Sequence, residues 1–341
     1  MANYIINITN SQVNIRFNHT EDTSRSIPDQ EVSSMAEAVI SQVLREQFEP
    51  KKRHNMFLAD AYQASGMSNA SNKAVRLATC ARWLEFAIPP AGDDKRYKIT
   101  KTSSCHVRLC PVCQWRRSLN TYRNLARIYA APEIKGMKHI FVTLTQKNVP
   151  GAALAAEIKR ISDAYAAMMR RKPFKDIVQG YTRTIEVTRG KDGTFHPHIH
   201  AIWSVKRSYG SKEYVSQKYL CEEWQNALKI DYRPVCDIRV IKKMDGKSVA
   251  EVAKYSVKPS DYITDSIEST ADLITILDPA LDGKRFVSYG GIVREIKNRL
   301  FHEAAIEDIE AGNLEAIEWE NWERVLYEWH FSEQKYKKIT V

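Results

Sequence analysis

The chain of 341 residues is long enough to bury an ample core in one large domain or two smaller ones. With 43% hydrophobic and 27% charged residues it has the composition of a globular protein, without a membrane-length apolar run or a secretory signal, so we expect a cytoplasmic location. The net charge of +10 favours a polyanionic partner.

The first 75 residues contain no motif to which we assign a role. Residues 1–35 are polar and rich in Asn, Ser and Thr, and residues 32–48 have a helical pattern that runs into the charged sequence EPKKR. We therefore treat residues 1–75 as an N-terminal region of unknown role.

A group of cysteines follows. Cys105, Cys110 and Cys113 are closely spaced, and Cys80 lies upstream. In a chain expected in the cytoplasm, clustered cysteines are better explained by a metal than by disulfides. Four thiolates would make a closed structural zinc site, with His106 as the substitute if Cys80 is not the fourth ligand.

The same segment is strongly basic. Between Lys95 and Pro132 there are nine basic residues and no acidic one. Such segregation predicts a phosphate-binding surface rather than a merely solvated one. We therefore predict a zinc-binding basic module at 76–131, with these DNA-binding candidates: Arg108, Arg116, Arg117 and Arg123.

The middle of the chain predicts an α+β fold. Residues 138–145 read as a strand, 151–171 as a helix, 181–188 and 195–205 as a hairpin, and 235–241 as a short strand. A helix follows. Since the connections are short, we expect a mainly antiparallel sheet packed by helices.

The hairpin carries the sequence HPHIH. Alternation in a strand places His196, His198 and His200 on one face, where two imidazoles can share a divalent metal. If three residues at the turn set the register, Glu186 lies directly opposite His198 and becomes the third ligand. His196 is the alternative third ligand. This donor set suits Mn²⁺ or Mg²⁺ acting on phosphate oxygens.

Helical spacing over residues 248–257 predicts a stripe of polar residues on one helix face: Glu251, Lys254, Tyr255 and Lys258. A tyrosine nucleophile needs positive charge, a base or a metal nearby, and the lysines supply the charge. Alternatively, Ser248 and Glu251 form a capping box, and Tyr255 is a surface residue. Tyr262 is a weaker candidate nucleophile, because Pro259 interrupts the helix before it.

The end of the chain is acidic. From Glu303 to Glu333 there are ten acidic residues, and Arg324 is the sole basic one. Aromatic residues are also frequent here: Trp319, Trp322, Tyr327 and Trp329. We predict an acidic, aromatic helical tail at 301–341 that packs against the core or a partner.

A strand with His, a bulky apolar residue and His, followed by Glu-x-x-Lys-Tyr-x-x-Lys, resembles the rolling-circle plasmid replication initiators (Rep proteins) of the HUH endonuclease superfamily. The likeness is to the subgroup with one catalytic tyrosine and a glutamate one helical turn before it. It extends over roughly residues 76–300, through blocks at 105–119, 141–149, 186–203, 251–262 and 284–295.

The resemblance implies an HUH nuclease core at residues 132–300 and a site-specific DNA nickase and strand transferase. Tyr255 would form a 5′-phosphotyrosine, Lys254 and Lys258 would steady phosphate charge, and Glu251 would assist hydrolysis at termination. The implied partners are single-stranded or extruded hairpin origin DNA and a host helicase and polymerase. The alternatives are an HUH transposase or relaxase, and a non-catalytic zinc-ribbon DNA-binding regulator.

Overall fold

The structure is a computed structural model that describes residues 4–9, 12–17, 29–88, 98–211, 213–242, 246–310 and 322–339. Internal contacts divide the chain into two compact units. The first unit comprises residues 1–56, 75–105 and 307–341, and the second comprises residues 57–74 and 106–306. The division falls within two helices, α2 (Glu49–Ala64) and α3 (Ala70–Thr79).

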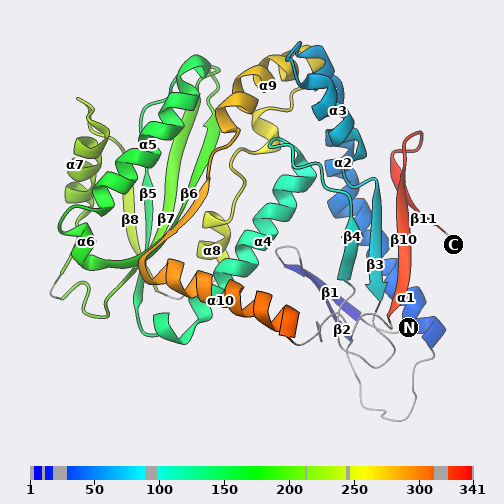
Figure 1. Ribbon diagram of the computed structural model, residues 1–341, viewed down its shortest axis with the longest axis horizontal. Helices are drawn as coiled ribbons and strands as arrows, with labels where there is room; N and C mark the ends of the chain where they lie inside the picture. The colour runs from blue at the N-terminus through cyan, green and yellow to red at the C-terminus, as the bar shows by residue number, and fades with distance from the viewer. Residues whose placement is uncertain are drawn as a thin grey trace, which may run out of the picture. The chain divides into compact units, whose positions relative to one another are not determined.

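The first unit contains a four-stranded antiparallel sheet whose strands come from distant parts of the chain, in the order β11-β10-β3-β4. Figure 1 shows its C-terminal strands in red beside the cyan β3. The strands are β3 (Trp83–Ile88), β4 (Lys98–Thr102), β10 (Glu323–His330) and β11 (Lys335–Ile339). Also present are the hairpin β1 (Tyr4–Thr9) and β2 (Gln12–Phe17), α1 (Asp29–Val43) and a π-helical segment at Leu44–Phe48.

The prediction of a helical C-terminal tail is therefore wrong for residues 323–339. Val325, Tyr327 and Trp329 are buried at every second position of β10, which is the period of a strand. Their burial agrees with the expected packing against a core. Trp319 lies outside the described residues. The different roles assigned to the four predicted domains stay predictions.

The second unit is built on a five-stranded antiparallel sheet in the order β8-β5-β7-β6-β9. The long central strands are β6 (Val178–Arg189) and β7 (Phe195–Val205), flanked by β5 (Lys138–Leu144), β8 (Cys236–Ile241) and β9 (Val287–Gly290). The β6–β7 pairing places Glu186 opposite His198, which confirms the predicted register. The predicted α+β class with an antiparallel sheet is also confirmed.

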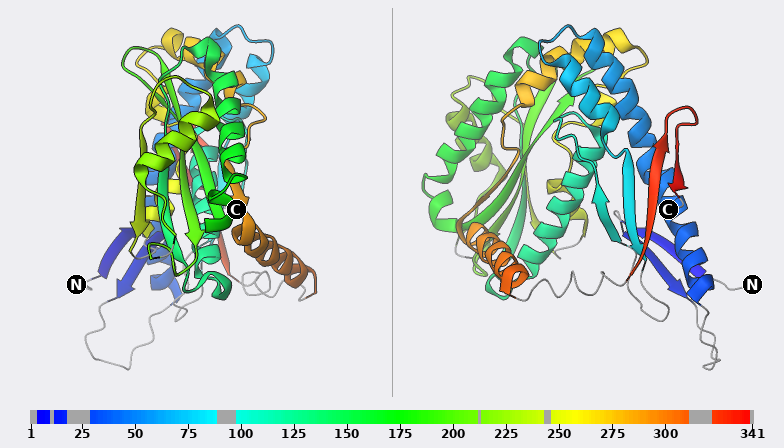
Figure 2. Two further views of the ribbon diagram at one scale, coloured as in Figure 1. Left: turned by 90° about the vertical axis from the view of Figure 1, so that its left-hand side faces the viewer. Right: turned by 45° about the vertical axis from the view of Figure 1, so that its right-hand side comes forward.

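Helices cover both faces of this sheet (Figure 2, right). Arg183 and Trp203 form hydrogen bonds with residues of α5 on one face, whereas Thr182 forms one with Tyr129 of α4 on the other. The helices are α4 (Pro111–Ala130), α5 (Leu154–Met169), α6 (Phe174–Ile177), α7 (Gln217–Leu228), α8 (Gly246–Val252), α9 (Ile267–Leu281) and α10 (Gly291–Glu310). Short 3-10 turns occupy Pro132–Ile134, Gly151–Ala153 and Pro259–Asp261. None of the helices in the described ranges is long and apolar enough to cross a membrane.

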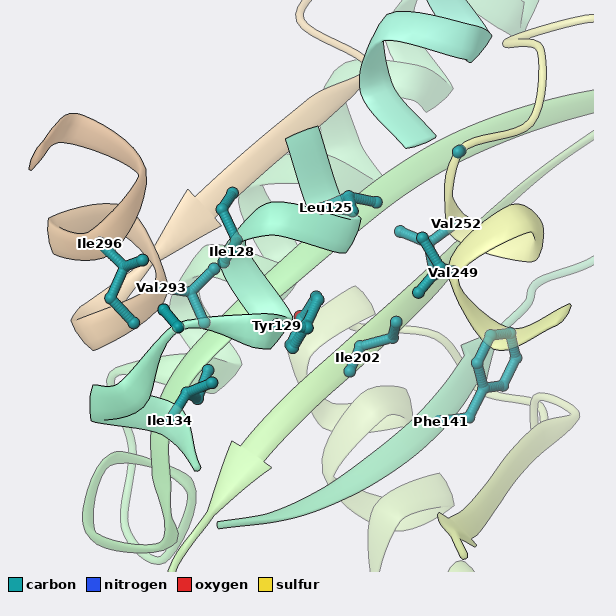
Figure 3. Packing of buried hydrophobic residues seen from close by; sticks show 12 residues of the cluster. Leu125, Ile128, Tyr129, Ile134, Phe141, Ile202, Val249, Val252, Val293 and Ile296 are labelled. Carbon is teal, nitrogen blue, oxygen red and sulfur yellow. The ribbon is translucent and has the colours of Figure 1, made fainter. Parts of the chain in front are cut away.

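The core on the α4 face fixes the position of α8. Val249 and Val252 of α8 pack in one buried cluster with Phe141 of β5, Ile202 of β7 and Leu125 of α4 (Figure 3). Because apolar burial is the main driving force for such packing, the cluster holds the short α8 against the middle of the sheet. The polar residues that follow α8 therefore start from a fixed point beside β7.

The helix ends earlier than its sequence pattern predicts. α8 stops at Val252, so the expected single helical stripe through Tyr255 and Lys258 is not formed. Instead the backbone N–H of Val187 donates to Ser256 O at 2.8 Å, and Val257 pairs with Val187 in a parallel bridge. β9 pairs only with residues 181–184 of β6, which leaves Val187 free to pair with the segment after α8. Backbone hydrogen bonds to β6 therefore take the place of the last turns of the expected helix.

Candidate active site

Two neighbouring strands bring three potential metal ligands together. Nε2 of His198 lies 3.5 Å from Oε2 of Glu186, and Nε2 of His200 lies 3.4 Å from the same oxygen. All three residues are buried, and their ligand atoms lie within 4.8 Å of one another. In an octahedral metal site with ligands at ~2.1 Å from the ion, neighbouring ligand atoms are about 3 Å apart. The observed distances of 3.4 and 3.5 Å are slightly longer, so a small movement of the three side chains toward one another would give such a site.

Hydrogen bonds at the second ring nitrogen orient both imidazoles. Nδ1 of His198 lies 3.1 Å from the backbone oxygen of His196, which can only accept, so this Nδ1 carries the hydrogen. Nδ1 of His200 lies 3.1 Å from the hydroxyl of Thr143 on β5. Both rings thus present Nε2 toward Glu186, as metal-binding histidines with a supporting partner do.

His196 lies at the edge of this group. Its ring packs against that of His198, with centroids 5.2 Å apart, and its Nδ1 bonds to Oδ1 of Asn148 at 2.9 Å. It is not among the residues whose ligand atoms converge in the described part of the chain. The arrangement favours Glu186 over His196 as third ligand, although the identity of that ligand stays a prediction.

The carboxylate of Glu186 is surrounded by positive or potentially positive groups. Nζ of Lys258 lies 3.2 Å from Oε1 of Glu186 and forms an ion pair with it. Burial alone would raise the pKa of Glu186, but His198, His200 and Lys258 together lower it below its ordinary value. A carboxylate that stays ionised is a suitable cation ligand.

Glu251 reaches the same group from α8. Its Oε1 lies 4.0 Å from Nε2 of His200 and forms an ion pair with Lys254. The capping-box alternative is not supported, because α8 begins at Gly246, two residues before Ser248. Glu251 therefore stands beside the candidate metal ligands rather than at a helix start.

Tyr255 lies in the segment that pairs with β6. Burial raises the pKa of its phenol to about 12, and a hydrogen bond with the side chain of Ser118 on α4 opposes part of that rise. The hydroxyl of Ser118 also lies 2.9 Å from the backbone oxygen of Trp115, to which it can donate. The nucleophile candidate is thus held by strand pairing on one side and by α4 on the other.

Tyr262 has a different environment. Its side chain is fully buried, and its hydroxyl donates to Leu109 O at 2.5 Å while accepting from Nε2 of Gln114 at 3.2 Å. Burial raises its pKa well above the ordinary value. A tyrosine with every hydrogen-bonding position used and no solvent access is a structural residue, which favours Tyr255 as the nucleophile.

The four predicted zinc ligands also converge. The sulfur atoms of Cys80, Cys105, Cys110 and Cys113 lie within 4.8 Å of one another, and all four residues are buried. Sulfurs of a tetrahedral zinc site at ~2.3 Å from the ion are about 3.8 Å apart, so this donor set could bind zinc. His106, the alternative ligand, is exposed and is not part of the group.

The predicted DNA-binding arginines lie on α4 or just before it. Arg117 and Arg123 are exposed, and Arg116 is half-buried. Arg108 is half-buried, with its guanidinium 5.3 Å from the ring centre of Phe286 and one nitrogen donating to Lys284 O at 3.1 Å. Their binding to DNA stays a prediction.

Sequence reasoning did not single out Ser118, Thr143 or Asn148. Thr143 belongs to the strand predicted at 138–145. If the pairing of that strand with the HPHIH strand had been known, Thr143 would have been placed opposite His200. Ser118 and Asn148 carry no comparable signal, because their contacts to Tyr255 and His196 join segments far apart in the sequence.

Comparisons with known proteins identify the family. The model of the replication protein family Rep_1 matches residues 96–337. "Protein rep" of Bacillus amyloliquefaciens is 35% identical over 311 residues, which cover 82% of this chain and 90% of that protein. "Protein rep" of Streptococcus pneumoniae is 32% identical over 301 residues, which cover 84% of this chain and 90% of that protein. "Protein rep" of Lactiplantibacillus plantarum is 36% identical over 261 residues, which cover 70% of this chain and 81% of that protein.

No solved structure matches the chain. The family match begins within the basic segment, includes both candidate metal groups except Cys80, and extends through the C-terminal strands. A match over most of the chain, together with relatives that align over nearly their whole length, is decisive. The chain belongs to the Rep_1 family of replication proteins.

Proposed function

We propose that this protein initiates rolling-circle replication of a plasmid by nicking one strand of the origin, and that it has an HUH endonuclease site. The observation that carries the proposal is the shared use of β6. Glu186 of that strand lies 3.4–3.5 Å from two imidazoles, and the next residue, Val187, bonds to the segment of Tyr255. A metal-ligand group and a nucleophile candidate are thus attached to adjacent residues.

In the proposed step the phenolic oxygen of Tyr255 attacks the scissile phosphorus. The P–O3′ bond breaks, a 5′-phosphotyrosine forms, and the phenolic proton is balanced by protonation of the departing 3′ oxygen. The free 3′-OH then serves a host polymerase, with a host helicase opening the duplex. Single-stranded or extruded hairpin DNA is the expected substrate, because the phosphate must be reached by a partly buried phenol.

His198, His200 and Glu186 would hold Mn²⁺ or Mg²⁺, which when bound supplies charge to the phosphate oxygens. The donor set fits: two imidazole nitrogens and one carboxylate whose pKa is lowered by its neighbours. Lys258 already lies against Glu186 and would keep that carboxylate ionised, whereas Lys254 is placed to steady phosphate charge near Tyr255. The four cysteines would hold structural Zn²⁺ near the basic α4.

Glu251 would act at termination. After strand transfer the phosphotyrosine bond must be hydrolysed, and a carboxylate near the site can take the proton from the attacking water. The ion pair with Lys254 holds the carboxylate of Glu251 beside the Tyr255 segment.

Incubation of the protein with supercoiled plasmid carrying its origin, in Mn²⁺ or Mg²⁺, tests the proposal. We expect nicked circles and a peptide adduct at Tyr255, identified by mass spectrometry. A non-catalytic regulator would yield no nicked circle, and an adduct on any other residue would contradict the assignment.

A further inference from the structure

A small pocket lies beside Tyr255 on the α4 side. It is lined by residues of α4, of the Tyr255 segment and of β9 and its preceding loop, including Arg108, Arg117, Ser118, Lys254 and Tyr255. Gln114, Arg117, Ser118 and Thr121 follow one face of α4 at helical spacing. The helix α4 thus supplies one wall of the pocket, and the Tyr255 segment supplies another.

The charge of the pocket is one-sided. Its lining contains Arg108, Arg117 and Lys254 but no aspartate or glutamate. Arg117 makes no ion pair or hydrogen bond to another described residue, whereas Lys254 forms an ion pair with Glu251. Burial and the charge of Arg117 lower the pKa of Arg108, and the charge of Asp282, which does not line the pocket, opposes them in part. The two guanidinium groups therefore repel each other.

Such a cationic pair is stabilised by an anion that both guanidinium groups can reach. Guanidinium groups bind phosphate through paired N–H donors, so two of them facing one pocket suit a single phosphate group. Arg108 is held in place by Phe286 and by the backbone oxygen of Lys284, so it is already oriented before any ligand arrives.

The pocket adjoins the candidate metal group without including it. None of Glu186, His198 and His200 lines it, whereas Thr184 does. Thr184 lies opposite His200 and is two residues, about 7 Å, along β6 from Glu186. A phosphate bound between Arg108 and Arg117 would therefore lie beside the phosphate that Tyr255 and the metal ligands would serve. It would be a neighbour of that phosphate in the same strand.

We propose that Arg108 and Arg117 form a subsite for one backbone phosphate of single-stranded DNA adjacent to the scissile phosphate, so that the strand is held in register beside Tyr255. This inference rests on the proposed function, because it assigns the pocket to the DNA strand that Tyr255 would attack. The subsite fixes which phosphodiester reaches the nucleophile, a task that the metal group alone does not perform.

The test uses the full-length protein without added Mg²⁺ or Mn²⁺, so that binding is measured without cleavage. The probe is a single-stranded oligonucleotide from the plasmid origin, in a series where a neutral methylphosphonate replaces one phosphate at a time. We expect one position at which the replacement weakens binding by about tenfold, the usual effect of losing a charge-assisted contact. In Arg117→Gln, binding of the unmodified strand should weaken by a similar factor, and the penalty at that position should disappear.

Arg127→Gln is the matched control, because it removes the same charge from an exposed position of α4, about 15 Å from Arg117 along the helix and outside the pocket. It should keep the position-specific penalty. A penalty that is equal in wild type and Arg117→Gln, or a wild type without any position-specific penalty, would overturn the subsite. Since binding is read without cleavage, a protein that shows the penalty but never nicks would refute the proposed function and not the pocket.

Discussion

Replacing Glu251 by glutamine separates the two chemical steps of the proposed reaction. The substitution keeps the size of the side chain and removes its charge and basicity. Tyr255 attacks without water, so initial cleavage should survive at normal or mildly reduced rate. Hydrolysis of the phosphotyrosine should fall by roughly a hundredfold or more, which is the usual effect of losing a general base.

The structure shows why this effect cannot come from unfolding. The side chains of Glu251 and Lys254 are 34% and 36% exposed, so their ion pair contributes at most about 1 kcal/mol. A hundredfold change in rate corresponds to about 2.7 kcal/mol of activation free energy. Since folded proteins commonly have a stability of about 5–15 kcal/mol, losing the ion pair leaves nearly all molecules folded.

A single-turnover assay with a labelled origin oligonucleotide would follow the covalent adduct on a denaturing gel. Glu251→Gln should form the adduct and accumulate it, whereas Glu133→Gln, which removes a comparably exposed carboxylate paired with Arg299, should alter neither step. Equal loss of both steps would refute the reasoning. It would instead assign Glu251 to the metal group, from which it is separated by only 4.0 Å at His200.

Four other substitutions and the removal of zinc have definite expected outcomes. Tyr255→Phe should abolish nicking and adduct formation while leaving origin binding nearly intact in a gel-shift assay, and a persisting adduct would contradict the assignment. His198→Ala and His200→Ala should each lose metal-dependent nicking without loss of the folded state in thermal melting, and near-normal activity in Mn²⁺ would exclude them as ligands. Ser118→Ala removes the hydrogen bond that lowers the pKa of Tyr255, so the pKa should rise above about 12 and nicking near pH 8 should slow, because less phenolate is present. Stripping zinc with a strong chelator should destabilise residues 76–131 and weaken DNA binding, since structural zinc contributes folding free energy, and freshly purified protein without zinc in elemental analysis would contradict the site.

The hairpin that carries the candidate metal ligands could be predicted because its determinants are local. Alternating side chains and the HPHIH sequence determine which residues share a face. The register depended on the turn, and Glu186 lies opposite His198 as expected for a three-residue turn. The convergence of the four cysteines was also predictable, because two cysteines separated by two residues, as Cys110 and Cys113 are, typically bind one metal ion together with further thiolates.

The elements that were predicted wrongly depend on partners remote in the sequence. The helix through Tyr255 ends at Val252 because Ser256 and Val257 pair with Val187 of β6, some seventy residues earlier. The C-terminal tail forms strands because β10 pairs with β3, more than two hundred residues away. In both places local helix propensity is weaker than the backbone hydrogen bonds and burial that a sheet edge offers.

The early end of α8 has a consequence for the chemistry. A continuous helix would place Glu251, Lys254 and Tyr255 on one face, with the phenol as free to move as any exposed helical side chain. The observed pairing of Ser256 with Val187 instead ties the backbone beside Tyr255 to the strand that carries Glu186. Backbone hydrogen bonds to a central strand restrict movement far more than a short helix end does. The distance between the candidate nucleophile and the candidate metal ligands is therefore set by the geometry of β6, which is the preorganisation that the proposed in-line attack on one phosphate among many would require.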